Sequence, residues 1–436
     1  MCKFKLSQFN HYEYLDDKIL IYNRLQNKFA CLEKNENNVI DISNLSNETL
    51  LKMKENGYVV PENYDEDIQG EDLYSKILNS DILSLTILAS ENCNFSCRYC
   101  FEEYNGRNIQ EDVQKNLIKY IKKHIHQFVG LNISWFGGEP LLAKDSIYNM
   151  SEQMIDICRK VSRAYFSSIT TNGYLLDIDT FRKLLHYKVL KYTITIDGLK
   201  DTHDFSRPLK NGTGTFDKIF ENLRMIRDNV RSTQFKIYIR TNVTTDVQEN
   251  FDEYLEFMDR EFGSDSRFSF IFSPVFDWGG DRIESMRDKL IDSLEIIYNK
   301  ILNQKCKINL DAMKEQLSNQ MCQYAKKNTY TINTSGDIFL CPQLMELQIG
   351  KLGEGKLILD DYNLAYWYSL TSKSSGNCRK CSDFSICKGR RCVRDLMIFE
   401  RNQIEEPIMY CGREYEQIGI TLQLLYKLNN SFFEKL

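Results

Sequence analysis

The chain of 436 residues lacks three features that would place it in other classes of protein. It has no apolar run of the roughly 18 residues that a membrane-spanning helix needs. Its 56 Lys and Arg are outweighed by 61 Asp and Glu, for a net charge of −5, so nucleic acid is not the expected partner. Its first residues lack the apolar core of a signal peptide. We therefore expect a cytoplasmic protein that neither crosses a membrane nor binds nucleic acid.

The sequence is, by contrast, rich in cysteine, with 14 residues. In a reducing compartment this number favours metal ligation over disulfide bonds. Most of the cysteines fall into two groups, near positions 93–100 and 322–411. The length is sufficient for two or three domains with a large buried core.

Cys93, Cys97 and Cys100 have a C-x3-C-x2-C spacing directly after an apolar run over 83–89. Three thiolates bind three corners of a [4Fe–4S] cluster and leave the fourth iron free. A small molecule with an amine and a carboxylate can chelate that iron. The alternative is a zinc site or a set of buried thiols. Zinc favours paired C-x2-C and needs a fourth ligand, and no fourth Cys or His lies close by in the sequence.

The triad, with the aromatic Tyr99 before its last cysteine, resembles the signature of radical S-adenosylmethionine (SAM) enzymes. The resemblance implies that SAM chelates the free iron and is cleaved to methionine and a 5′-deoxyadenosyl radical, which removes hydrogen from a substrate. Tyr99 would lie against the adenine. A core aromatic beside the cluster is the other interpretation of this residue.

Apolar strand-like and helix-like patterns alternate from about residue 80 to 305, which predicts an α/β domain with a parallel sheet. Two stretches, 109–127 and 215–228, have the apolar stripe of an amphipathic helix. Cys158 shares a similar stripe with Met150, Met154 and Val161 and is predicted to be a core residue. The superfamily implies that the sheet curls into a partial (β/α)6 barrel. The strand candidates are 83–89, 131–136, 166–171, 191–196, 235–241 and 267–273.

Polar motifs follow the second and third predicted strands, where sites of parallel sheets gather. Gly137-Gly138-Glu139 and the proline after them resemble the superfamily's GGEP motif, which holds the methionine amine of SAM. Asn172 follows the third strand, where the ribose would lie. By itself, each segment is equally consistent with an ordinary turn.

The fourth strand ends in a longer motif, Thr195-x-Asp-Gly followed by His-Asp, Arg207 and Gly-Thr-Phe. This run resembles the peptide- and protein-modifying branch of the superfamily. It implies that Thr195 lies at the cofactor and that Arg207 binds the SAM carboxylate; a structural ion pair is the alternative for Arg207. Arg240 and Asn242 could reach the nucleoside or simply end a strand. Asp277 could act as a base or substrate anchor, or belong to a plain loop.

The carboxyl-terminal region, residues 306–436, resembles a SPASM domain, which holds two further [4Fe–4S] clusters. A zinc ribbon would need two C-x2-C pairs, and only Cys378/Cys381 qualifies. The resemblance implies that Cys322, Cys341 and Cys392 bind the nearer auxiliary cluster, while Cys378, Cys381, Cys387 and Cys411 bind the farther one. The 388–391 gap is one residue longer than usual. Cys306 is a possible fourth ligand of the nearer cluster, which otherwise has an open iron.

Residues 1–75 predict a small winged-helix-like α+β module. Apolar runs at 19–22 and 29–32 suggest a hairpin, followed by a helix over 47–56 and a strand at 58–60. This order is similar to the leader-recognition segments of peptide-modifying radical enzymes, which bind a peptide as an added strand or in a groove. A packing extension of the main domain is the alternative. The acidic stretch 62–72 suggests a solvated linker.

These resemblances imply a radical SAM oxidoreductase that matures a ribosomally made precursor peptide (a RiPP maturase), forming a Cys thioether or other side-chain cross-link. Ferredoxin or flavodoxin would supply electrons. A sulfatase-maturing enzyme, which makes formylglycine, is the second hypothesis. That group typically has Asp directly after the cysteine equivalent to Cys341, where this chain has Pro342. A non-catalytic metal-binding adaptor is the third, although an adaptor has no need of an amine-binding Glu139.

Overall fold

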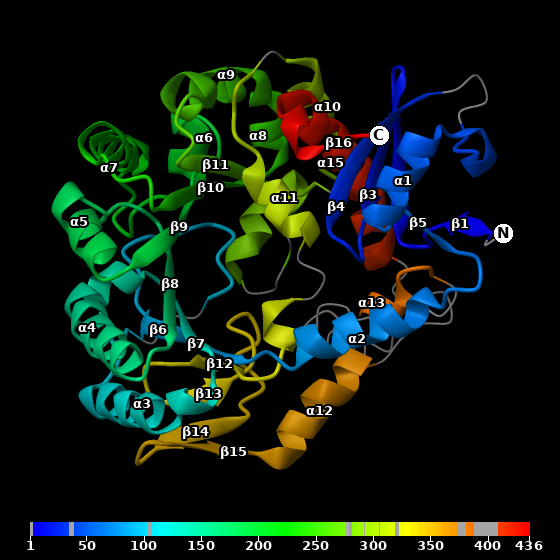
Figure 1. The fold of residues 1–436 in the computed structure, drawn as a ribbon. Helices are drawn as coiled ribbons and strands as arrows, with labels where there is room; N and C mark the ends of the chain where they lie inside the picture. Colours follow the sequence, from blue (N-terminus) through cyan, green and yellow to red (C-terminus); the bar gives the residue numbers. More distant parts are fainter. Residues whose placement is uncertain are drawn as a thin grey trace.

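The computed structural model describes residues 3–34, 39–102, 106–275, 277, 281–291, 293–304, 306–318, 322–372, 381–387 and 409–436. Its centre is a ten-stranded sheet with helices along its outer side (Figure 1). A four-stranded sheet, made of three amino-terminal strands and one from the carboxyl terminus, and a two-stranded amino-terminal ribbon lie at the right of that view.

Six of the ten strands of the large sheet form a parallel series in chain order, as the alternating pattern predicts. Each strand pairs in parallel with the next along the chain. All six predicted strands are confirmed, with ends within three residues of the predicted ones. They are β6 (Ile82–Ser90), β7 (Gly130–Gly137), β8 (Ala164–Thr171), β9 (Val189–Thr195), β10 (Lys236–Val243) and β11 (Phe268–Pro274).

The connecting helices bury their apolar stripes against this sheet. Met150, Met154 and Cys158 lie in the hydrophobic core, which confirms that Cys158 is a core residue. Val161 is 41% exposed, so its assignment to the same stripe is wrong; the helix ends at Lys160, before the stripe would reach it. The helices are α3 (Glu111–His124), α4 (Lys144–Lys160), α5 (Ile178–His186), α6 (Lys200–Ser206), α7 (Phe216–Asn229), α8 (Thr245–Glu249) and α9 (Phe251–Phe262).

The sheet does not close on itself among the described residues, because the free edge of β6 is taken by a later strand. β12 (Thr329–Ile332) pairs in parallel with β6. An antiparallel series then extends the sheet outward, so that the hydrogen-bonding groups at this edge are paired rather than exposed. The series is β13 (Asp337–Phe339), β14 (Gly350–Gly353) and β15 (Lys356–Leu359).

The amino-terminal sheet contains the predicted hairpin, but the far end of the chain completes it. The outer strand β16 (Glu434–Lys435) pairs in parallel with β4, and the helix α15 (Met409–Leu428) packs against β2 and β3. The predicted helix and strand are also confirmed, and β5 pairs with β1. The elements are β1 (Phe4–Leu6), β2 (Asn10–Leu15), β3 (Lys18–Asn23), β4 (Lys28–Glu33), α1 (Asn47–Glu55) and β5 (Val59–Pro61).

The predicted linker over 62–72 is wrong, because most of it belongs to the helix α2 (Glu66–Leu78). Asp65 caps this helix by accepting from the Asp67 backbone N–H, and acidic residues in a first turn suit the positive end of a helix. Glu66 is buried and accepts from the Gln8 backbone N–H at 3.0 Å. The acidic run therefore marks a helix start and not a linker, although its acidic side chains other than Glu66 are exposed as predicted.

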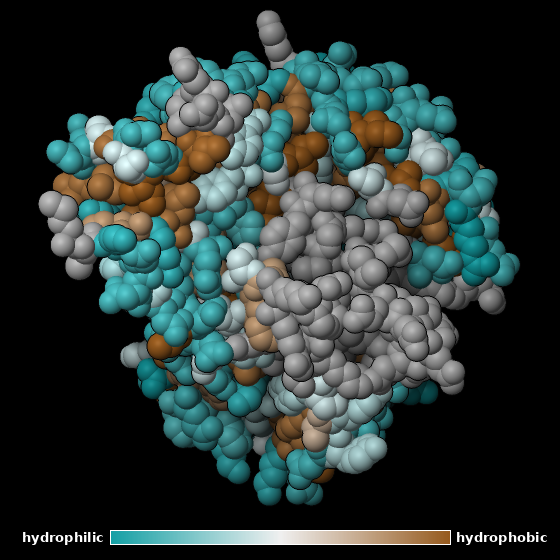
Figure 2. All heavy atoms as spheres, turned by 90° about the vertical axis from the view of Figure 1, so that its right-hand side faces the viewer, coloured by the Kyte–Doolittle hydropathy of each residue, from teal (hydrophilic) through white to brown (hydrophobic). Residues whose placement is uncertain are grey.

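The remaining helices of the described chain are α10 (Glu295–Asn303), α11 (Asp311–Ser318), α12 (Asp361–Ser372) and α13 (Phe384–Cys387). On the side of the molecule that faces right in Figure 1, hydrophilic side chains surround smaller hydrophobic groups (Figure 2). Across the described ranges, we find no helix that is both long and apolar enough to cross a bilayer.

Candidate active site

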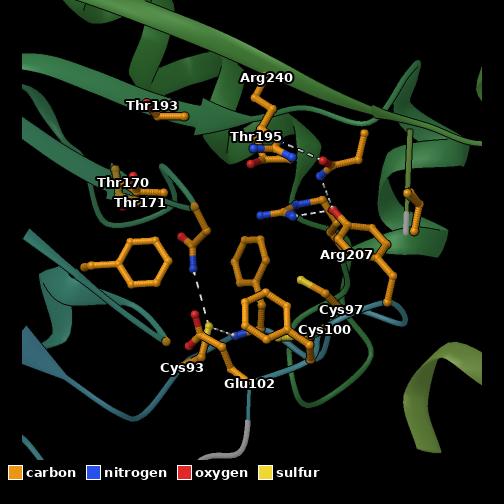
Figure 3. A pocket seen from close by; sticks show the side chains of 18 of the residues that line it. Cys93, Cys97, Cys100, Glu102, Thr170, Thr171, Thr193, Thr195, Arg207 and Arg240 are labelled. Carbon is orange, nitrogen blue, oxygen red and sulfur yellow. Dashed lines mark hydrogen bonds between the residues drawn. The ribbon is translucent and has the colours of Figure 1, made fainter. Parts of the chain in front are cut away.

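A cavity of about 400 Å³ opens at the carboxyl ends of the parallel strands (Figure 3). Side chains from the loop after β6 and from the ends of β7, β8, β9, β10 and β11 line it, which is where parallel sheets place their sites. Of the residues predicted to bind a cofactor or metal, it brings together Cys93, Cys97, Tyr99, Cys100, Gly137, Gly138, Asn172, Thr195 and Arg207.

The cysteine loop is fixed to the segment that ends α6. Backbone N–H groups of Ser96 and Arg98 donate to the carbonyls of Pro208 and Ser206 at 2.8 and 3.0 Å. Cys93 and Cys97 are buried, and burial raises the pKa of their thiols to about 11 and about 12. Such thiols ionise when a metal binds them, because coordination removes the proton.

The described residues form no ready-made site for a single metal ion. Among the described residues, no three Cys, His or acidic side chains converge closely enough to hold one metal ion. A single zinc needs that convergence. A [4Fe–4S] cluster does not, because each thiolate binds a different iron.

The paired glycines hold the ends of β6 and β7 together. Gly137 has a φ of +122°, and a Cβ at this position would lie 2.1 Å from the Ser90 carbonyl oxygen. Gly138 donates its backbone N–H to the same oxygen at 3.0 Å. Only glycine permits this conformation and this approach, so the wall of the cavity here is bare backbone.

Glu139 does not line the cavity but lies fully buried beside it. Its carboxylate accepts from the Leu141 N–H at 2.9 Å, the Thr171 hydroxyl at 2.7 Å and the Asn172 N–H at 2.7 Å. Burial raises the pKa of this carboxyl group, and these three donors act in the opposite direction. In this arrangement Glu139 joins β7 to β8.

Tyr99 and Arg207 form the polar side of the cavity. The Tyr99 hydroxyl donates to the Asp197 carboxylate and accepts from Arg207 Nη1 at 2.6 Å and Asn242 Nδ2 at 2.9 Å. Arg207 is 7% exposed, and its Nε has no hydrogen-bond partner in the described structure. Arg207 lines the cavity, and a buried guanidinium N–H is suited to an anionic group of a ligand. The alternative of a structural ion pair is also present, because Arg207 Nη1 lies 3.9 Å from the Asp197 carboxylate.

Arg240 also reaches the cavity from β10. Its Nε donates to Asn242 Oδ1 at 2.9 Å, and its Nη2 donates to Ser273 at 3.2 Å. Figure 3 shows Arg207 between Arg240 and the cysteines.

Asp197, His203 and Glu102 are among the residues of the site that were not selected from the sequence. Asp197 and His203 belong to the motif that contains Arg207, so that motif carried the signal. Glu102 lines the cavity two positions after Cys100, and burial, with the charges of Glu91 and Glu139, raises its pKa to about 7. A single acidic residue next to a cysteine motif belongs to no motif of its own, so Glu102 could not be selected from the sequence.

Asp277 lies outside the cavity lining. It is exposed and pairs with Arg287 at 3.0 Å.

The carboxyl-terminal cysteines are described only in part. Cys378 and Cys392 lie outside the described residues, as do the side chains of Cys387 in α13 and Cys411 in α15. Cys381 is half-buried. Cys341 is buried, whereas Cys322 is exposed; both lie near Tyr324, where burial first and then these thiols raise the Tyr324 pKa to about 12.

Comparison with known proteins identifies the domain. The model of the radical SAM superfamily matches residues 87–259, from β6 to α9, which include the cysteine triad and Arg207. The chain contains a radical SAM domain. Members of that superfamily are enzymes that use SAM with an iron–sulfur cluster, and this chain, which contains the domain, is an enzyme.

The similarity to individual relatives extends beyond the matched span. A cysteine-type anaerobic sulfatase-maturating enzyme of Clostridium perfringens is 23% identical over 340 residues, which cover 71% of this chain and 89% of the relative. The structure of native anSMEcpe with bound AdoMet and the Kp18Cys peptide has a TM-score of 0.59 at 19% identity, covering 80% of this chain and 99% of that one. Streptococcus suis SuiB bound to the precursor peptide SuiA has a TM-score of 0.52 at 16% identity, covering 90% and 96%. The two structural likenesses concern the fold.

Proposed function

We propose that this radical SAM enzyme matures a ribosomally made peptide, forming a Cys thioether or another side-chain cross-link. The observation that carries the proposal is the shared cavity of the cysteine triad and Arg207. When bound there, the cluster and SAM supply a radical that removes hydrogen from carbon. The fold likeness to SuiB, whose structure holds a precursor peptide, supports a peptide substrate.

The residues of the cavity fit the cofactors. Cys93, Cys97 and Cys100 would bind three irons of the cluster. The unpartnered Nε of Arg207 would donate to the SAM carboxylate. The SAM amine and ribose would meet Gly137, Gly138, Asn172 and Thr195, while Tyr99 would bound the adenine. Glu139, which does not line the cavity, would support this wall from behind.

A thioether made from a C–H and an S–H group needs an electron acceptor. One hydrogen leaves as an atom, and the other leaves as a proton together with one electron. An auxiliary [4Fe–4S] cluster bound by Cys322, Cys341 and Cys392 would accept that electron, and a ferredoxin or flavodoxin would supply the electron for SAM cleavage. The second auxiliary cluster would use Cys378, Cys381, Cys387 and Cys411.

The first auxiliary cluster would keep an open iron for a substrate thiolate. Burial raises the pKa of Cys306, and the charged groups that act on this thiol are Asp259 of α9 and Lys427 of α15. Cys322 and Cys341 instead lie near Tyr324, next to β12. The surroundings of Cys306 therefore differ from those of the other two thiols, which supports a cluster without Cys306.

Residues 1–75 would recognise the leader of the precursor, the barrel of residues 80–305 would carry the radical chemistry, and residues 306–436 would hold the auxiliary clusters. In the four-stranded sheet, the edge of β4 is taken by β16, whereas β2 is the other edge strand. An added peptide strand would therefore pair with β2.

Sulfatase maturation is the second candidate, because sulfatase-maturating enzymes are among the relatives. The residues after Cys341 favour peptide cross-linking. Pro342 replaces the acid typical of that group, and Gln343, which lines the cavity, is not a base either. We expect Pro342→Asp alone to give no formylglycine in a sulfatase-type peptide, as measured by mass spectrometry.

The decisive experiment uses anaerobically reconstituted protein, with Cys97→Ala as the control. Reduced wild type should release 5′-deoxyadenosine from SAM, and the control should not. Short Cys-containing peptides encoded beside the gene should become lighter by the mass of the hydrogen that is removed when the cross-link forms. Formylglycine in a sulfatase peptide would instead establish the second candidate. No 5′-deoxyadenosine from protein with full iron content would indicate a non-catalytic adaptor.

A further inference from the structure

Five residues around the cavity form a closed ring of hydrogen bonds. The Asp197 backbone N–H lies 3.1 Å from His203 Nδ1, and His203 Nε2 lies 3.1 Å from the Thr215 hydroxyl. Thr215 donates to the Arg207 carbonyl at 2.8 Å. The side chain of Arg207 donates to the Tyr99 hydroxyl, which donates to the Asp197 carboxylate and closes the ring.

The ring has a single consistent direction. A backbone N–H can only donate, so His203 Nδ1 must accept and the imidazole proton must lie on Nε2. Nε2–H then donates to Thr215, which leaves the threonine proton for the Arg207 carbonyl. Burial first, and the Arg207 cation second, lower the pKa of His203 well below its usual value, so the required neutral form is favoured.

The backbone of Arg207 is held on both sides, and the His203 side chain acts on one of them. The Arg207 N–H donates directly to the His203 carbonyl at 2.8 Å. The Arg207 carbonyl is held through Thr215 by the imidazole. Arg207 follows the last residue of α6 and has a non-helical backbone, with φ −134° and ψ 55°. The helix therefore holds its N–H through the i→i−4 bond to His203, but it does not fix its carbonyl.

We propose that His203 is a positioning residue that acts through Thr215 to set where the Arg207 guanidinium stands in the cavity. It does not touch the reacting atoms. The ring also contains Tyr99, which belongs to the cysteine loop. It therefore holds the Arg207 guanidinium beside that loop. The inference rests on the proposed function only in taking the ligand of Arg207 to be the SAM carboxylate.

The competing explanation is that His203 and Thr215 only stabilise the fold. His203 packs edge-on against Phe216, with ring centroids 5.7 Å apart, so its replacement would also disturb the core. Thr215 offers a cleaner test. It is the residue before α7, yet its hydroxyl makes no capping bond to that helix, so Thr215→Val removes the link to Arg207 with little change of shape.

The test measures the dissociation constant for SAM on cluster-loaded protein without reductant. Thr215→Val should weaken binding roughly tenfold, the order expected for one or two lost hydrogen bonds. Thr215→Ser keeps the hydroxyl and should stay within about twofold of wild type. In an Arg207→Lys background, Thr215→Val should add no further loss, because the group that it positions is already gone. Thermal unfolding of each variant checks that the proteins are folded.

An unchanged dissociation constant in Thr215→Val would overturn the inference. The inference would also be overturned if Thr215→Val weakened SAM binding equally in the wild-type and the Arg207→Lys backgrounds. Equal losses would mean that the two residues act independently, because independent effects add. Both outcomes require that wild type binds SAM. If wild type with a full cluster does not bind SAM, the proposed function fails instead.

Discussion

Arg24 Nη1 donates to Asp383 Oδ2 at 2.8 Å, so a residue after β3 forms a buried ion pair with one that lies between Cys381 and Cys387. The side chains are 11% and 1% exposed. His11 Nε2 lies 3.1 Å from the same oxygen. The amino-terminal sheet therefore supports the segment that carries two of the proposed auxiliary-cluster ligands.

Breaking this pair should destabilise the protein strongly. Arg24→Met leaves Asp383 buried without its guanidinium partner, and we expect a loss of about 3 kcal/mol in the free energy of unfolding, measured by urea denaturation. Lys18→Met is the matched control, because Lys18 pairs with the exposed Glu33. That change should cost below about 1 kcal/mol. Similar losses in the two variants would show that the Arg24 pair is no stronger than a surface pair.

Gly137→Ala should damage the wall of the cavity. The new Cβ would meet the Ser90 carbonyl at 2.1 Å in a backbone that L residues rarely adopt. We expect a loss of roughly 3 kcal/mol in stability and weaker SAM binding. Gly212→Ala is the control, since Gly212 has a φ of +84° but a Cβ added there would meet nothing within 4 Å. Its cost should be about 1 kcal/mol, with SAM affinity kept. A cost for Gly137→Ala no larger than that of Gly212→Ala would contradict the close approach.

Stability should fall in weak acid because of His203. Its pKa in the folded protein lies well below the ordinary 6.5, so below pH 6.5 the unfolded chain takes up a proton that the folded chain does not. The stability that neutral His203 contributes is present above pH 6.5 and is lost as the pH falls. Each pH unit should cost up to about 1.4 kcal/mol.

His203→Gln should flatten this dependence. The comparison is the unfolding midpoint in urea at pH 7.5 and pH 5.5 for the two proteins. The other histidines contribute equally to both, so their effects cancel. If His203→Gln lost as much stability in acid as wild type, a group other than His203 would be responsible for the pH dependence.

Cys306→Ser should leave the iron content of reconstituted protein unchanged. Cys306 lies beside Asp259 and Lys427, while Cys341 lies beside Tyr324. Cys341→Ser should lower the iron content by the share of one cluster. The measurement is iron and sulfide per protein, with electron paramagnetic resonance of the reduced samples. An equal loss in Cys306→Ser would make Cys306 a ligand of the nearer cluster.

Much of the parallel series from β6 to β11 was predictable, because the sequence patterns that indicate its strands and helices are local. The strand ends come from runs of apolar residues, as in 83–89, and the helices from stripes such as that of α3. The cysteine triad and the glycine pair were also predictable, because the spacing of their residues along the chain is itself the signal. The linker over 62–72 was mispredicted because acidic residues suit both solvent and a helix amino terminus, and only the burial of Glu66 distinguishes the two.

Sequence alone determined the chemistry available at the strand ends: three thiols, a glycine pair and an arginine, each fixed by short-range spacing. Tertiary structure decided what those groups contact. It placed β12 beside β6 and β16 beside β4, since strand pairing joins segments that are distant in the chain and leaves no local pattern. It also turned Glu139 toward backbone donors and linked His203 to Arg207 through Thr215, because a hydrogen bond is set by the position of both partners in space.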